Sequence, residues 1–413
     1  MARINFDKLV KDFQLMEAEQ PTRGTQLGKG SRHLREAFAA KTIRWQDADL
    51  ANLFESCYGW GPTRQFMRGE QFSVIREDVG ATSSVAFQNI TQQITYSAVM
   101  EGYQAEEFVF TKMIPTRQSP FVVGEKVPGV TELPDAAQVV GEQEEFPIAG
   151  VSEDFIEMPD PRTRGFRVAA TRLAIFGMQG IGVSGKFMER INKLSLSLGR
   201  NREKRAIDVI LDENAGASSG VATHRYKWRG DLMATYGNNS GTHTFDNLET
   251  ANALLNFASL NTIEKLFSQM VDPNTGEPIN VLADTIITAP ELTPQVYHVL
   301  HSISVMLQAG GFAQSGNLYR SEAGSPIGKT EFSSTYKPVS SRLLASRMAL
   351  TTNWYVGQPS MAFEYVENWA PQVLVAPPLS HDEFTRDIVF QARISERGAF
   401  GTKDPRFMAK SSV

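Results

Sequence analysis

The residues best suited to chemistry lie at positions 180–187, where glycines and a lysine follow the spacing of a phosphate-binding loop. Backbone amides between a strand and a helix can cradle a phosphate at such a place. In that motif the residue after the lysine supplies a hydroxyl group for magnesium, but here Phe187 follows Lys186. We therefore predict a hinge in place of a nucleotide site, and keep nucleotide binding as an alternative. The predicted hinge glycines are Gly177, Gly180, Gly182 and Gly185.

Two further patterns resemble catalytic or metal-binding motifs. The letters GASSG at residues 216–220 match a nucleophile elbow, but that elbow requires a strand before the serine, and this stretch follows a predicted helix. His298 and His301 share a predicted helix face, yet no cluster of carboxylates or thiols accompanies them. The sequence therefore predicts no catalytic residue, no metal site and no cofactor.

The strongest pattern is a reversal of charge between two neighbouring stretches. Residues 119–164 carry ten acidic and three basic side chains together with six prolines, whereas residues 186–205 carry seven basic and two acidic side chains. The acidic stretch has too few apolar residues to build its own core, so it needs a complementary surface to become ordered. We expect that surface on a neighbouring copy of the chain. The predicted contact residues are Glu125, Glu132, Glu142, Glu144, Glu145 and Asp154 on one side, and Arg190, Arg200, Arg202, Lys204 and Arg205 on the other.

The elements that position these charges are two arm helices, a strand and one long helix. Residues 31–55 and 87–108 have helical apolar spacing, and residues 165–176 have the composition of a strand. Ser184–Glu213 is predicted as one helix, and about thirty helical residues span about 45 Å, a length typical of a structural spine. Its predicted apolar stripe is Phe187, Ile191, Leu194 and Leu198.

The remaining segments predict an α/β unit followed by returning strands. A helix near residues 247–257, a turn at 272–276, a buried strand at 281–288 and a helix at 293–302 follow one another along the chain. Residues 388–394 alternate in polarity, as a strand does. Prolines interrupt the acidic stretch, which favours a long two-stranded excursion over a packed sheet. Together these segments predict an α+β protein.

The overall composition is that of an ordinary soluble protein. The 413 residues are 41% hydrophobic and 21% charged, and the net charge of -5 gives the whole chain no attraction to nucleic acid. Cys57 is the only cysteine, which excludes an internal disulfide. No apolar run is long enough to span a membrane, and residues 1–13 lack a signal-peptide core. We expect a protein that is intracellular when made, neither exported nor in a membrane.

Several stretches, spread over the whole chain, suggest a known layout. They are FQNIT at residues 87–91 with Tyr103 and Phe108, residues 142–147 leading to GFRVAATR at 165–172, the turn at 272–278 before a buried strand, and FTRDIVF at 384–390. None of these is a strict motif. Their order resembles that of the major capsid proteins of tailed bacteriophages that share the HK97 fold.

The resemblance implies an α+β fold of five consecutive parts. These are an N-terminal arm with helices at 1–118, an extended loop (the E-loop) at 119–165, a strand and the spine helix of the P-domain at 166–229, an A-domain at 230–349, and C-terminal strands at 350–413. The C-terminal strands are expected to return to both domains. Residues 165–176 and 385–394 are expected to pair in the P-domain sheet.

The resemblance also implies a structural function without enzymatic activity. Subunits are expected to assemble as pentamers and hexamers into an icosahedral shell around double-stranded DNA, so that the protein is made in the host cytoplasm and ends in the virion. Implied partners are other copies, portal and scaffolding proteins, a decoration protein in some members, and packaged DNA in non-specific contact. Some members cross-link through a loop lysine, but nothing marks a partner for Lys126, the only lysine of this loop. An encapsulin-like compartment shell and a P-loop nucleotide hydrolase are the alternatives.

Overall fold

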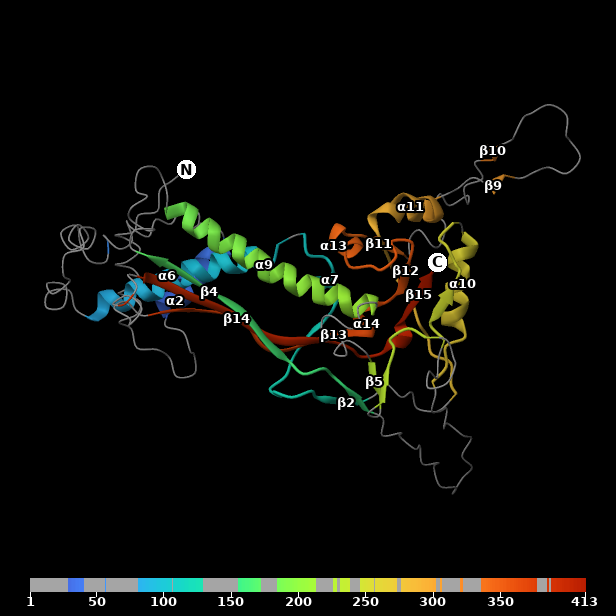
Figure 1. Cartoon of the computed structure of the whole chain (residues 1–413), viewed down its shortest axis with the longest axis horizontal. Helices are drawn as coiled ribbons and strands as arrows, with labels where there is room; N and C mark the ends of the chain where they lie inside the picture. The colour runs from blue at the N-terminus through green and yellow to red at the C-terminus, as the bar shows by residue number, and fades with distance from the viewer. Residues whose placement is uncertain are drawn as a thin grey trace, which may run out of the picture. The chain divides into compact units, whose positions relative to one another are not determined.

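The computed structural model of the chain (Figure 1) contains two compact units, each built from separate stretches of the sequence. Unit 1 comprises residues 1–108, 163–201 and 369–397, and unit 2 comprises residues 109–162, 202–368 and 398–413. The structure describes residues 29–40, 56, 81–105, 107–128, 155–171, 184–212, 226–228, 231–237, 246–255, 257–272, 276–301, 305–306, 320–321, 336–376, 385 and 388–413.

The helical part of unit 1 consists of two arm helices and the first part of the spine helix. These are α2 (Lys29–Ala39), α6 (Ala81–Tyr103) and α9 (Ser184–Leu211), the long green helix in Figure 1. α2 packs on α6, where the Arg35 guanidinium lies 4.4 Å from the centre of the Tyr96 ring. α6 approaches α9 closely because Gly102 has no side chain, and a Cβ there would lie 2.5 Å from the carbonyl oxygen of Asn192. The predicted spine helix is confirmed to within two residues of its end.

The buried stripe of α9 is shifted from the predicted one. Ile191 and Leu198 are buried as predicted, but Leu194 is 41% exposed, so the prediction is wrong at that position. Ser195 is buried in its place, and its hydroxyl donates a hydrogen bond to the carbonyl oxygen of Ile191 at 2.8 Å. The buried face therefore follows the i, i+4, i+7, i+11 series from Ile191 to Arg202.

A four-stranded sheet contains the longest strands among the residues that the structure describes. Its order is β1 (Thr116–Gln118), β13 (Phe363–Val375), β14 (Ile388–Thr402) and β4 (Arg162–Thr171). β1 runs parallel to β13, with Thr116 opposite Tyr365. β4 and β14 are neighbours, and a Cβ at Gly165 would overlap the carbonyl oxygen of Ile394. The predicted pairing of residues 165–176 with 385–394 is therefore confirmed for residues 165–171 and 388–394, the strand residues of these ranges that the structure describes.

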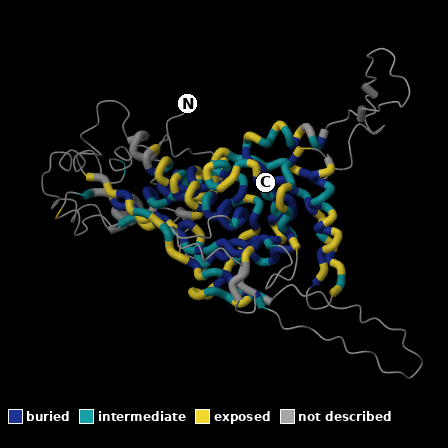
Figure 2. The backbone as a smooth tube through the Cα atoms, turned by 45° about the vertical axis from the view of Figure 1, so that its right-hand side comes forward, coloured by how far each residue is buried: buried dark blue, intermediate teal, exposed yellow. Residues whose placement is uncertain are grey.

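Unit 2 contains a five-stranded sheet with a hydrophobic core on each face. Its order is β11 (Lys337–Val339), β8 (Thr285–Thr288), β12 (Trp354–Gly357), β15 (Met408–Ser412) and β7 (Leu248–Thr250). All residues of β8 and β12 are buried, which confirms the end of the strand predicted at 281–288. Figure 2 draws buried residues in dark blue. Alternate residues of a strand face opposite sides. Tyr355 accordingly belongs to the core that includes the end of α9, and Trp354 to the core that includes Leu260 and Ile263.

Short helices and two smaller sheets complete unit 2. The helices are α7 (Phe110–Met113), α10 (Phe257–Ser268), α11 (Thr293–His301), α13 (Arg342–Ala345) and α14 (Pro359–Ala362), with 3-10 turns η4 (Pro290–Leu292) and η5 (Pro405–Phe407). The order of the second sheet is β2 (Lys126–Pro128), β3 (Phe155–Glu157), β5 (Tyr226–Trp228) and β6 (Asp231–Met233). β9 (Val305–Met306) pairs with β10 (Arg320–Ser321). These helices and sheets confirm the predicted α+β class.

The helix predicted near residues 247–257 is wrong. Residues 248–250 form β7, which pairs in parallel with β15, and the helix begins only at Phe257. Ala251 has a φ of 59°, which lies outside the right-handed helical region. A helix cannot continue through this residue, although the apolar spacing on either side of it suggested one. The turn predicted at 272–276 is present, because the Gly276 amide donates to the carbonyl oxygen of Asp272 at 2.7 Å and Gly276 has a φ of 74°.

Replacing Glu264 with glutamine is expected to stabilise the protein near pH 7. Partial burial on α10 raises the pKa of Glu264 above its ordinary value, because burial disfavours the charged form. Ionisation therefore costs folding free energy once the pH rises above the ordinary glutamate pKa of about 4.3. The Glu264→Gln variant should unfold at a higher temperature than the parent near pH 7, and at the same temperature near pH 4.

The exposed Glu291→Gln variant is the matched control and should leave the unfolding temperature unchanged at both pH values. Thermal unfolding followed by circular dichroism measures both variants. Equal unfolding temperatures for Glu264→Gln and parent near pH 7 would show that burial does not penalise this carboxylate.

Candidate functional site: the root of the acidic loop

The described part of the acidic loop (residues 119–165) is its root, where the chain enters and leaves. β2 and β3 pair antiparallel there, with Lys126 opposite Glu157 and Pro128 opposite Phe155. The Lys126 ammonium lies 3.9 Å from a Glu157 carboxylate oxygen and 4.3 Å from the centre of the Phe155 ring. The predicted two-stranded excursion is therefore confirmed at its root.

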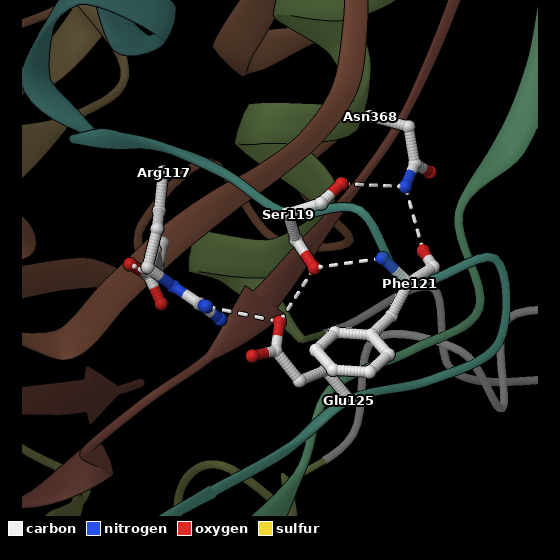
Figure 3. Close-up of polar contacts among 6 residues, drawn as sticks. Arg117, Ser119, Phe121, Glu125 and Asn368 are labelled. Atoms are coloured by element: carbon white, nitrogen blue, oxygen red, sulfur yellow. Dashed lines mark hydrogen bonds and ion pairs between the residues drawn. The ribbon is translucent and has the colours of Figure 1, made fainter.

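A polar clamp holds this root to strand β13 (Figure 3). Its members are Arg117, Ser119, Glu125, Glu364 and Asn368. Arg117 donates from Nε to Glu364 and from Nη1 to Glu125, both at 2.9 Å. The Ser119 hydroxyl donates to the same Glu125 oxygen at 2.7 Å. One guanidinium thereby links a carboxylate of β13 to a carboxylate of the loop, and charged partners make these hydrogen bonds stronger than neutral ones.

The clamp also fixes the backbone of the loop root. Asn368 donates from Nδ2 to the carbonyl oxygens of Ser119 at 2.8 Å and Phe121 at 2.6 Å. On the other side, the Gly124 amide donates to an Asp160 carboxylate oxygen at 2.6 Å. A Cβ at Gly124 would lie 2.4 Å from the carbonyl oxygen of Met158, so this position requires glycine. Residues 119–125 are therefore held by β13 on one side and by residues 158–160, between β3 and β4, on the other.

A buried carboxylate of the spine helix anchors the segment that leads into the loop. Glu203 is 1% exposed and accepts hydrogen bonds from the backbone amides of Val109, Phe110 and Thr111 at 2.9, 2.8 and 2.8 Å. It also accepts one from the Thr111 hydroxyl at 2.6 Å. The first amides of a helix have no partner within it, so Glu203 satisfies those of α7. Glu203 therefore fixes residues 109–111, which precede β1 and the acidic loop, to α9.

Two of the predicted basic contact residues of α9 are buried inside unit 2. Arg202 and Arg205 are each 8% exposed. Their guanidinium groups lie 4.1 Å from the centre of the Tyr365 ring and 5.8 Å from the centre of the Phe400 ring. A contact with a neighbouring copy would require these two side chains to face outward. They face inward because they lie four and seven residues after Leu198, on the buried face of the helix.

Other predicted contact residues lie at the surface. Arg200 is exposed and pairs with Glu107 at 3.4 Å, and Lys204 is half-buried. Glu125 differs from expectation, because its carboxylate is engaged by the clamp within its own unit. The predicted residues that fall outside the described ones are Glu132, Glu142, Glu144, Glu145, Asp154, Gly177, Gly180 and Gly182. Arg190 and Gly185 lie in α9, in its second and first turns. The contacts proposed for these residues stay predictions.

The described residues contain no evident site for chemistry of other kinds. No group of three or more histidine, cysteine, aspartate or glutamate side chains within this part of the chain could hold a metal ion. None of the helices in the described ranges is both apolar and long enough to cross a membrane. Residues 216–220 lie outside the described ranges. His298 and His301 fall in α11.

Sequence reasoning missed four of the five clamp residues, Arg117, Ser119, Glu364 and Asn368. Their spacing held a signal, because Arg117 and Ser119 are two apart and Glu364 and Asn368 are four apart. Residues at even spacing lie on one face of a strand. Strands were expected within residues 350–413 but without bounds, and β1 was not predicted, so the two pairs were not brought together.

Comparison with known proteins places the chain in a family. The family model described as phage capsid protein matches residues 157–411, more than half of the 413 residues. No curated protein matches the chain. Solved structures similar to it include the virus-like particle from Pyrococcus furiosus, at 11% identity with a TM-score of 0.38, covering 77% of this chain and 97% of that one.

Two phage structures are similar to the same degree. The capsid of the cyanophage P-SCSP1u is 11% identical with a TM-score of 0.41, covering 74% of this chain and 88% of that one. Mycobacterium phage Che8 is 12% identical with a TM-score of 0.38, covering 74% of this chain and 90% of that one. The matched residues begin at the end of β3 and include the spine helix, nearly all of the five-stranded sheet and the long strands β13 and β14. The chain therefore belongs to the phage capsid protein family and is a capsid shell protein.

Proposed function

We propose that this capsid protein assembles as pentamers and hexamers into an icosahedral shell that encloses the double-stranded DNA of a tailed phage. The observation that supports this most is the anchoring of the acidic loop. The clamp and the contacts to Met158 and Asp160 hold the loop at its base. A loop that is fixed at its base and too poor in apolar residues to form a core suits contact with a neighbouring copy.

Charge complementarity supplies the register of that contact. Glu132, Glu142, Glu144, Glu145 and Asp154 of one copy would face Arg190, Arg200 and Lys204 of the next. Exposed ion pairs contribute about 0–1 kcal/mol each. Pairs of this strength orient neighbouring subunits more than they bind them, and they allow misplaced subunits to leave. The net charge of -5 keeps packaged DNA from adhering to the shell.

The same chain must fit both pentamers and hexamers. The glycines of residues 177–185 act as the hinge that allows this change, because glycine tolerates many backbone conformations. The other proposed partners are a portal protein, a separate scaffolding protein and, on the outer surface, a decoration protein. Assembly takes place in the host cytoplasm and the product is the virion. The role is structural, and tight ATP binding that is lost in a Lys186→Ala variant would contradict it.

Electron microscopy of the purified full-length chain, with sedimentation velocity, tests the proposal. Large closed shells built on rings of five and six subunits are expected, together with nuclease-protected DNA in particles isolated from infected cells. Small closed shells without nucleic acid would instead indicate a compartment shell. A chain that stays monomeric at high concentration, with and without a crowding agent, would overturn the proposed function.

A further inference from the structure

Three consecutive large apolar side chains lie exposed in the segment that the clamp holds. Phe121, Val122 and Val123, here called the apolar tip, are 56, 59 and 70% exposed. No other run of three large apolar residues is exposed within the part of the chain that the structure describes, where Leu255 and Leu282 are isolated examples. Scattered exposed apolar residues are ordinary. A run of three is unfavourable in water unless it binds something.

The apolar tip is held rigidly. The Phe121 amide donates to the Ser119 hydroxyl at 3.3 Å, and the Phe121 carbonyl oxygen accepts from Asn368 at 2.6 Å (Figure 3). The Gly124 amide, directly after the tip, donates to Asp160. A binding element that is fixed before contact loses little conformational entropy on binding. The clamp therefore holds the apolar tip in one exposed conformation, ready for contact.

The charges around the tip are already engaged. The Glu125 carboxylate accepts from Arg117 and Ser119, and the Asp160 carboxylate accepts from the Gly124 amide. The tip itself offers aromatic and aliphatic surface, so its partner surface should be apolar. This distinguishes it from the contact proposed for the acidic residues farther along the loop, which depends on charge.

We propose that the apolar tip binds a second copy of this chain, as the apolar part of the interface between shell subunits. This inference rests on the proposed function. Stable interfaces bury about 1,200–2,000 Å² in total, whereas one large aromatic side chain contributes about 150–250 Å². Three side chains are too few to hold an independent protein, but they fit as one patch of a larger contact. The tip is continuous with β2, which leads into the loop proposed to lie on a neighbour.

A double variant tests the proposal on the full-length chain. Phe121→Ser with Val123→Ser should leave the unfolding temperature of the monomer unchanged, because both side chains are exposed. The critical concentration for assembly should rise by about tenfold or more, since each subunit loses the burial of two large side chains. Leu255→Ser with Leu282→Ser removes two apolar side chains of similar exposure from the same unit and is the matched control. Assembly of the tip variant at the parent's concentration, or equal loss in the control, overturns the proposal.

Photo-crosslinking gives a second readout that does not depend on how the double variant folds. A benzophenone side chain at position 121 of the otherwise unchanged protein should form cross-links between two copies in assembled shells. Cross-links confined to one chain, or made to a different protein of the particle, would overturn the proposal while leaving the proposed function intact. If the parent itself forms neither rings nor shells, the proposed function fails and the tip proposal fails with it.

Discussion

Replacing Arg406 with methionine is expected to destabilise unit 2 by about 3–5 kcal/mol, because it leaves two buried carboxylates without their cation. Arg406 donates from Nε and Nη2 to Asp404 at 2.9 and 2.8 Å, and from Nη1 to Asp272 at 3.2 Å. All three residues are buried. Burial alone would lower the pKa of Arg406, but the two aspartates outweigh it and raise the pKa above its ordinary value. The guanidinium therefore stays charged at every pH at which the protein is folded.

The position of this triad explains why its loss should affect the whole unit. Asp404 accepts from the Arg406 amide at 3.1 Å and so caps η5, the turn between β14 and β15. Asp272 begins the turn closed by Gly276. Arg406 thus ties the end of the chain to a distant turn of the same unit.

A triple variant separates charge from packing. Arg406→Met combined with Asp404→Asn and Asp272→Asn removes all three charges, and asparagine still caps a helix. Replacing every member of a buried ionic group is often close to neutral, so the triple variant should regain most of the lost stability. Urea unfolding followed by intrinsic fluorescence measures the difference. Equal destabilisation of the single and triple variants would show that packing around Arg406 matters and its charge does not.

The sequence allows the long elements to be predicted but not the polar contacts between them. The spine helix depends on a sustained apolar spacing, which is local and visible in the letters. The clamp depends on β1 lying beside β13, two segments almost 250 residues apart, and no local pattern shows which strands become neighbours. The anchoring of α7 by Glu203 is non-local in the same way, with partners more than 90 residues apart.

The basic residues of α9 show a different limit. A count of charges groups Arg200, Arg202, Lys204 and Arg205, whereas helical geometry separates them. Arg202 and Arg205 lie four and seven residues after the buried Leu198 and share its face, so the guanidinium groups stack on aromatic rings. Arranging the charges by helical position would have predicted this. Helical position alone could not predict that Ser195 is buried and Leu194 exposed. That outcome depends on how closely α6 approaches α9 at Gly102.

Reversing the charge of the loop with Glu142→Lys, Glu144→Lys and Glu145→Lys is expected to abolish assembly while the monomer stays folded. In the proposed shell these side chains contact only a neighbouring copy, so each substitution should change the free energy of unfolding by less than about 0.5 kcal/mol. Between copies the effect is much larger, because like charges then oppose each other at every loop–spine contact in the shell. Sedimentation velocity and electron microscopy measure assembly, and thermal unfolding measures the monomer.

A charge exchange makes the test specific. Arg190→Glu, Arg200→Glu and Lys204→Glu reverse the spine surface, while Arg202 and Arg205 are left unchanged because they are buried. Each triple variant alone should stay unassembled, and a chain that carries both sets should assemble again, since the loop and spine charges are then complementary once more. Assembly of the parent should also weaken as salt is raised, because ions screen exposed charges. Unfolding of the loop variant would place its acidic side chains inside their own subunit. If the chain with both sets of substitutions does not assemble, the loop and spine charges do not pair with each other. The apolar tip, which carries no charge, would then contribute more to the contact between subunits than these charges do.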